Sequence, residues 1–185
     1  MNTVPNDLHW PNASEADLRI RTERLELFAC PARAARAVSS GRAQVQTLLG
    51  ARVAADWFDG EARSLLSYYA HWIAQDAALL GWGLWLIKLR EANLVIGSVG
   101  FKGRPDAAGV IEIGYGISAS HRRRGYTFEA AQALVAWGFA QPGVRAITAE
   151  CLPDNIGSIR ILEKLGMRQV GFVHSYLRWR LDKRE

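Results

Sequence analysis

The chain has 185 residues, of which 49% are apolar and 22% are charged, so we expect one soluble globular domain with a proper core. No apolar run approaches a membrane span and no secretory signal is visible at the N-terminus, so we expect a cytoplasmic protein that does not enter a membrane. The net charge of +5 is carried almost wholly by arginine and favours anionic partners, but the arginines are dispersed outside residues 122–124, so a nucleic-acid surface is not favoured.

The predicted elements form one α/β (α+β) unit. Residues 1–17 are predicted as a polar N-terminal arm and residues 18–185 as the domain. In chain order we expect a strand within 18–29, helices over 31–40, 43–56 and 61–78, strands over 84–89, 94–101 and 110–118, a helix over 125–140, a strand over 144–151, a helix over 155–165 and a hairpin over 168–182. This order indicates an antiparallel sheet portion with a crossover helix.

The most informative segment runs from the strand over 110–118 into the helix over 125–140. Its strand alternates apolar and polar or small residues, and Arg122-Arg-Arg-Gly125 stands between the two elements. The first N–H groups of a helix are unpaired and carry partial positive charge, so this junction is suited to a pyrophosphate. The alternative, a solvated basic turn, remains open for the three arginines.

A second segment begins at Pro153-Asp-Asn155. Asn155 is a good N-cap for the following helix, and Gly166 is a natural stop after it. Capping and core packing alone would explain this segment. Its distance and order relative to the arginine turn, however, suggest that both segments serve one site.

Together the two segments resemble the GNAT superfamily of N-acetyltransferases. Arg122-Arg-Arg-Gly125-Tyr-Thr127 matches the turn that wraps the pyrophosphate of acetyl-CoA, and the following motif matches Asn155, Ser158, Glu163, Lys164, Gly166 and Met167. Thr22-Glu-Arg-Leu25 is similar to the opening strand of the ribosomal-protein N-terminal (Rim-type) branch. The resemblance implies a mixed, mostly antiparallel sheet of six to seven strands flanked by helices and splayed between the fourth and fifth strands. Thr127 stands where relatives carry Gly or Ala, and Arg123 where many carry Gly.

The resemblance implies acetyl-CoA as co-substrate and no metal. The residues implied to bind it are Ile117, Ser118, Arg122, Arg123, Arg124, Gly125, Tyr126, Thr127, Asn155 and Ser158. Amine attack on a thioester needs a base and a donor to the leaving thiolate. Glu112 is the candidate base, with a structural carboxylate as the alternative, and Ser158 is the candidate donor because Leu162 replaces the tyrosine of many relatives. Tyr115 is a weaker candidate.

The implied activity is transfer of an acetyl group to a primary amine, of a protein or peptide N-terminus or of a small molecule, by direct attack in a ternary complex. The alternative is a non-catalytic acyl-CoA-binding sensor with the same fold. A homodimer is a further expectation. Trp57, Trp72, Trp82 and Trp85 fall where relatives form the acceptor wall, and the sequence does not separate core packing from an aromatic acceptor pocket.

Overall fold

The computed structural model describes residues 18–184, so the predicted arm, residues 1–17, lies outside the described residues. The strands are β1 (Arg19–Arg21), β2 (Leu25–Ala29), β3 (Arg52–Val53), β4 (Leu84–Leu89), β5 (Leu94–Phe101), β6 (Val110–Ile117), β7 (Ala146–Cys151), β8 (Arg168–Val173) and β9 (Tyr176–Asp182). The α-helices are α1 (Ala32–Arg36), α2 (Arg42–Leu49), α3 (Ala55–Trp57), α4 (Arg63–Gln75), α5 (Tyr126–Ala140) and α6 (Ile156–Lys164). A π-helical stretch, Phe58–Ala62, joins α3 to α4.

The strands form one mixed sheet with the order β1-β2-β4-β5-β6-β7-β9-β8, and β3 is attached to β5. The β6–β7 and β3–β5 pairs are parallel and the other pairs are antiparallel. Helix α5 makes the crossover between β6 and β7, as parallel neighbours require. The predicted fold class is therefore confirmed, with nine strands in the described part of the chain instead of six to seven.

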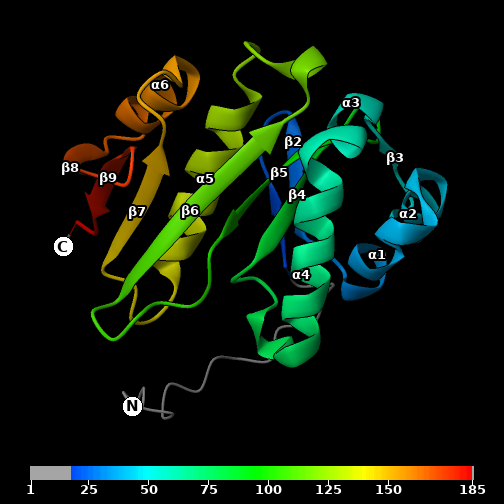
Figure 1. Ribbon diagram of the computed structural model, residues 1–185, viewed down its shortest axis with the longest axis horizontal. Helices are drawn as coiled ribbons and strands as arrows, with labels where there is room; N and C mark the ends of the chain where they lie inside the picture. Colours follow the sequence, from blue (N-terminus) through cyan, green and yellow to red (C-terminus); the bar gives the residue numbers. More distant parts are fainter. Residues whose placement is uncertain (1–17, 185) are drawn as a thin grey trace.

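The sheet opens between β6 and β7, the fourth and fifth predicted strands. These strands pair only over Val110–Glu112 and Ala146–Thr148, whereas β6 pairs with β5 as far as Ile117. Figure 1 shows the two strands diverging toward the ends that lead into α5 and α6. The starts of both helices therefore face each other across the opening.

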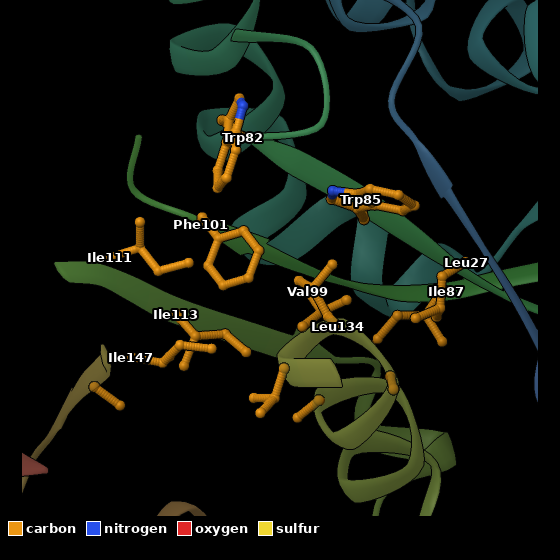
Figure 2. Packing of buried hydrophobic residues seen from close by; sticks show 14 of the residues in the cluster. Leu27, Trp82, Trp85, Ile87, Val99, Phe101, Ile111, Ile113, Leu134 and Ile147 are labelled. Atoms are coloured by element: carbon orange, nitrogen blue, oxygen red, sulfur yellow. The ribbon is translucent and has the colours of Figure 1, made fainter. Parts of the chain in front are cut away.

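Helices cover both faces of the sheet, with α4 on one side and α5 on the other (Figure 1). The α5 side holds the cluster in Figure 2, in which Trp85 and Phe101 from the sheet, with Trp82 from the turn before β4, pack with Leu134 of α5. Trp137 of α5 adds edge contacts to both tryptophans, with ring centroids 5.3 and 5.2 Å apart. A second cluster joins the opposite face to α1, α2 and α4. Two separate apolar cores therefore hold the sheet rigid behind the opening.

Two predicted elements differ from the structure near the N-terminus. The predicted strand within 18–29 is a hairpin, because the chain reverses at Thr22, whose hydroxyl oxygen accepts from the Leu25 N–H (3.0 Å). The predicted helix over 43–56 ends at Leu49, because Gly50 adopts a left-handed conformation (φ 61°) that ends helices. Val53 then belongs to β3 and pairs with Val95 of β5. This strand forms only because β5 is beside it.

Candidate active site

Two cavities meet at the opening of the sheet. The larger, about 890 Å³, lies between the starts of α5 and α6, and we call it the basic cleft because its lining includes Arg122, Arg123, Arg160 and Lys164. The smaller, about 550 Å³, lies between α4 and the sheet, and we call it the aromatic cavity because its lining includes Trp57, Tyr68, Tyr69, Trp72, Phe101 and Tyr115. Trp57, Tyr115 and Gly116 line both. A molecule in each cavity would therefore meet the other at these residues.

The turn before α5 forms one wall of the basic cleft. Arg123 (φ 59°) and Gly125 (φ 81°) both adopt left-handed conformations, and Gly125 caps the helix. The first hydrogen bond of α5 runs from the Glu129 N–H to the Gly125 carbonyl (3.0 Å), so the N–H groups of residues 126–128 have no intrahelical partner. These groups and the arginines give the turn the properties of an anion site. Arg123 thus occupies a conformation that favours glycine.

Arg24, in the turn between β1 and β2, supports this turn from behind. Its guanidinium donates to the Arg124 carbonyl (2.9 Å) and to the Glu129 carboxylate (2.7 Å), and it stacks 4.6 Å from the Tyr126 ring centroid. A side chain at Gly125 would meet this guanidinium, because a Cβ there would lie 3.2 Å from it. Arg24 therefore closes the outer side of the turn.

Glu129 links the same turn to the first hairpin. Its carboxylate accepts from the Arg24 N–H (3.0 Å), the Arg24 guanidinium and the Thr22 hydroxyl. Burial would raise the pKa of Glu129, but the hydrogen bonds from Thr22 and Arg24 outweigh it and lower that pKa below its ordinary value. The carboxylate is therefore ionised at neutral pH and holds the N-terminal hairpin against the first turn of α5.

The start of α6 forms the opposite wall. Asn155 caps the helix by accepting from the Ser158 N–H (3.1 Å), and both residues line the basic cleft. From β6, the Tyr115 hydroxyl reaches across the opening to the Ser158 carbonyl (3.4 Å). Burial raises the pKa of Tyr115 to about 12, so its hydroxyl stays protonated and can only donate or accept hydrogen bonds. Ser158 and Tyr115 thus lie together where the two cavities join.

The structure brings together most of the predicted coenzyme-binding residues but not all of them. The basic cleft is lined by Ile117, Arg122, Arg123, Gly125, Tyr126, Thr127, Asn155 and Ser158. Arg124 does not line it, and its carbonyl instead accepts from Arg24. Ser118 is 2% exposed, and its hydroxyl contacts the His121 ring (2.6 Å).

Asp56 of α3 also lines the basic cleft, from the side of the sheet opposite α5. Its carboxylate accepts from the Ser120 N–H (2.9 Å) and lines the basic cleft. That hydrogen bond from the Ser120 backbone lowers the pKa of Asp56. It joins α3 to the segment after β6 at the side of the basic cleft.

Glu112, the predicted base, lies on the strand face that also carries Gly114 and Gly116, since alternate residues of a strand share a face. Its carboxylate forms an ion pair with Lys102, which lines the aromatic cavity. Glu112 itself lines neither cavity. The contact of the structural alternative, a carboxylate paired with a neighbouring cation, is thus present, with Lys102 as the partner.

Two of the four tryptophans pack in the core and two line a cavity, the two roles that the sequence leaves open. Trp82 and Trp85 belong to the core, and the Trp85 indole N–H donates to the Gly81 carbonyl (2.8 Å). Trp57 and Trp72 line the aromatic cavity. Helical spacing on α4 could have indicated this wall, because Leu65, Tyr68, Tyr69 and Trp72 recur at three- and four-residue steps.

Several lining residues escaped the sequence interpretation. Asp56, His121 and Arg160 line the basic cleft, and Ser64, Ser98 and Lys102 line the aromatic cavity. None belongs to a recognised motif. The elements α3, α4 and β5 lie at the opening only because folding of the sheet brings them there. Across residues 18–184 we find no cluster of three metal-ligating side chains and no helix long and apolar enough to cross a membrane.

Comparison with known families decides what this arrangement belongs to. Residues 36–168 match the family model described as an acetyltransferase (GNAT) domain, which covers most of the chain and the whole opening. The chain belongs to the GNAT acetyltransferase family. It is therefore an acyltransferase enzyme, and the family uses acetyl-CoA as donor, which fits the anion site and the basic lining of the cleft.

Individual relatives extend this match over nearly the whole GNAT chain. An uncharacterized N-acetyltransferase of Bacillus subtilis (strain 168), YjdG, is 35% identical over 147 residues, which cover 80% of this chain and 88% of that protein. Among solved structures, the ribosomal-protein-S5-alanine acetyltransferase from Vibrio fischeri superposes with a TM-score of 0.65 at 14% identity, covering 90% and 97% of the two chains. A RimL ribosomal L7/L12 α-N-protein acetyltransferase in complex with coenzyme A gives 0.62 at 17% identity, covering 89% and 97%. These two structures support the fold.

Proposed function

We propose that this GNAT enzyme transfers an acetyl group from acetyl-CoA to a primary amine by direct attack in a ternary complex. The observation that carries the proposal is the junction of the two cavities at Trp57, Tyr115 and Gly116. Acetyl-CoA enters through the basic cleft and the amine through the aromatic cavity. Both reactants can therefore be bound at the same time and meet at the junction. Such a shared junction suits a reaction that depends on positioning.

The coenzyme is bound mainly by the turn before α5. Backbone N–H groups of residues 123–127 receive the pyrophosphate, and the guanidinium groups of Arg122 and Arg123 supply positive charge for its phosphates. Ile117 offers backbone atoms at the diverging end of β6, where the pairing with β7 has stopped. Thr127 adds a hydroxyl to the same wall. Asn155 and Ser158 bound the cleft on the α6 side.

Proton transfer is assigned to Glu112, on β6 outside the lining of both cavities, and to Ser158 in the basic cleft. The Glu112 carboxylate takes the amine proton through water, and Lys102 holds that carboxylate in place. Ser158 donates a hydrogen bond to the leaving thiolate, and the Tyr115 hydroxyl stands beside it as a second donor. The raised pKa of Tyr115 makes it a poor proton source for a thiolate, so its part is a hydrogen bond.

A covalent acyl-cysteine route has less support. Cys151 is 5% exposed and does not line either cavity. Burial raises the pKa of the Cys151 thiol despite the neighbouring Trp179 indole, whereas a nucleophilic thiol needs a lowered pKa. Direct attack by the amine therefore remains the proposed mechanism.

The likeness to the Rim-type branch supports a peptide α-amine as one acceptor class. The Thr22–Leu25 stretch that suggested this branch contacts α5 at the coenzyme end, through Thr22 and Arg24. This stretch therefore supports the turn that binds the coenzyme. The choice of acceptor depends on the aromatic cavity. A small-molecule amine is the other acceptor class.

The proposal extends to a homodimer formed at the β8 edge. Strand β8 ends the sheet order, and its Val170 and Phe172 side chains are 52% and 60% exposed. An apolar edge strand of this kind pairs readily with another chain. Light scattering should give twice the chain mass for the native protein and the single mass for Phe172→Lys; a native monomer would refute the dimer.

The activity is tested by following coenzyme-dependent release of free thiol with a panel of amines and peptides. We expect thiol release that requires both acetyl-CoA and an amine, with mass spectrometry showing the acetylated acceptor. Tight acetyl-CoA binding without turnover across a broad panel would contradict amine acetylation by this protein. An acetylated Cys151 trapped in the absence of acceptor would contradict direct attack.

A further inference from the structure

The aromatic cavity has a chemistry that restricts which amine it can hold. Trp57 and Phe101 are buried, and the Tyr68 and Trp72 rings of α4 form a tilted pair with centroids 6.4 Å apart at its side. Tyr68 is 67% exposed, so the apolar wall continues to the mouth of the cavity. An acceptor would therefore be in contact with aromatic surface from entry to the reacting end.

Among the side chains that the structure describes, no carboxylate lines the aromatic cavity. Its polar groups are the hydroxyls of Ser64, Ser98, Tyr68, Tyr69 and Tyr115 and the ammonium of Lys102, so the one charged side chain among these lining residues is positive. The carboxylate of Glu112 is paired with Lys102, the lysine of this lining. A polyamine or an aminosugar would have to lose the hydration of several positive charges without gaining counter-ions, which is costly.

The cavity also has room for a ring beside β6. Its floor includes Gly114, opposite Gly100 of β5, and a Cβ placed at Gly114 would have no heavy atom within 4 Å. A larger side chain there would project into the aromatic cavity without displacing the protein. The volume of about 550 Å³ lies in the range of pockets that enclose small organic ligands.

We propose, as a refinement of the function above, that the acceptor is an amine carried on an aromatic body without a second positive charge. The ring packs against Trp57, Tyr68 and Trp72, and the amine reaches the junction at Tyr115 and Gly116. The neutral form of the amine, which is the attacking form, is favoured by an apolar lining with no carboxylate. A free arylalkylamine and a peptide that begins with an aromatic residue share this chemistry.

The test compares acceptors and one variant. Tryptamine and the peptide Trp-Gly-Gly amide should exceed spermidine, kanamycin and Lys-Gly-Gly amide in kcat/KM by about tenfold or more. The ratio between tryptamine and the Trp peptide identifies the source of the aromatic amine. The faces of aromatic rings also attract ammonium groups. Spermidine, which carries several of them, is therefore the most demanding competitor.

Gly114→Leu fills the proposed ring site. With coenzyme A bound, titration calorimetry should show phenethylamine binding to the native protein and its loss in Gly114→Leu, with a smaller loss in Gly114→Ala. Unchanged coenzyme A affinity shows that the variants are folded. Glu91→Leu is the control, because it introduces the same side chain at an exposed turn position that lines neither cavity.

The outcomes separate this inference from the proposed reaction. Preference for spermidine or kanamycin, or phenethylamine affinity unchanged in Gly114→Leu, overturns the aromatic acceptor. If no amine is acetylated but phenethylamine binds and Gly114→Leu abolishes that binding, the reaction fails while the cavity assignment stands. If peptides starting with lysine are acetylated best, the reaction stands and the aromatic acceptor is refuted.

Discussion

The basic cleft and the aromatic cavity are neighbours, but they are built in opposite ways. The cleft draws its anion-binding groups from one short turn and one helix start, residues 122–128 and 154–158, and much of its binding capacity lies in the backbone. The cavity takes side chains from α3, α4, β4, β5 and β6, and its surface is largely apolar. Substitutions change side chains and leave backbone groups in place. A donor site built from backbone can therefore keep its function while substitutions alter an acceptor site built from side chains.

The two regions also differ in what keeps them in shape. The turn of the basic cleft is supported by polar contacts from Arg24 and Thr22 through Glu129. The aromatic cavity is supported by apolar packing, with Trp57, Leu66 and Tyr69 buried in the cluster between the sheet and α4. We therefore expect changes in charge to affect the coenzyme and changes in side-chain volume to affect the acceptor.

The largest expected effect tests the acceptor side. Glu112→Gln should lower kcat by about a hundredfold, because loss of a general base costs at least that much, while coenzyme affinity stays unchanged. Steady-state kinetics and coenzyme A titration measure the two quantities. Glu91→Gln, at an exposed turn position, is the control. Unchanged turnover in Glu112→Gln would remove this carboxylate from the mechanism and leave it as the partner of Lys102.

The next effect tests the coenzyme side. Arg24→Ala should weaken acetyl-CoA binding by about tenfold, or about 1.4 kcal/mol, because the turn loses its contacts to the Arg124 carbonyl and Tyr126. The value of kcat at saturating coenzyme should stay unchanged, and Arg24→Lys should restore part of the affinity. Arg21→Ala removes one exposed charge from the same hairpin and is the control. Equal losses in Arg21→Ala and Arg24→Ala would show that net charge, and not support of the turn, sets the affinity.

The smallest effect concerns pH. The pKa of Glu129 is lower in the folded protein than its ordinary 4.5, because the hydrogen bonds from Thr22 and Arg24 outweigh the opposing effect of burial. The resulting stability is present above pH 4.5 and is lost as pH falls through the folded pKa. Urea unfolding at several acidic pH values should show a shallower pH dependence for Glu129→Gln than for the native protein or Glu91→Gln. Identical slopes would contradict this role for Glu129.

Local patterns in the sequence were sufficient for most of the fold. Alternation predicted β6, and three- and four-residue recurrence predicted α5, because burial on one face imposes these periods. The prediction was wrong where a distant partner decides the structure. Thr22 reverses the first strand into a hairpin that rests on Glu129, and Arg52–Val53 becomes a strand because β5 is beside it.

The sequence by itself determined the family and predicted the anion site of the basic cleft, since the arginine–glycine turn and the Asn155 cap are short segments whose chemistry depends on local backbone. Only the tertiary structure decided that Trp57 and Trp72 line a cavity while Trp82 and Trp85 fill the core. It also decided that Glu112 pairs with Lys102 and that Arg24 supports the coenzyme turn. The physical reason is that these contacts join segments far apart in the chain, which no local period or motif records.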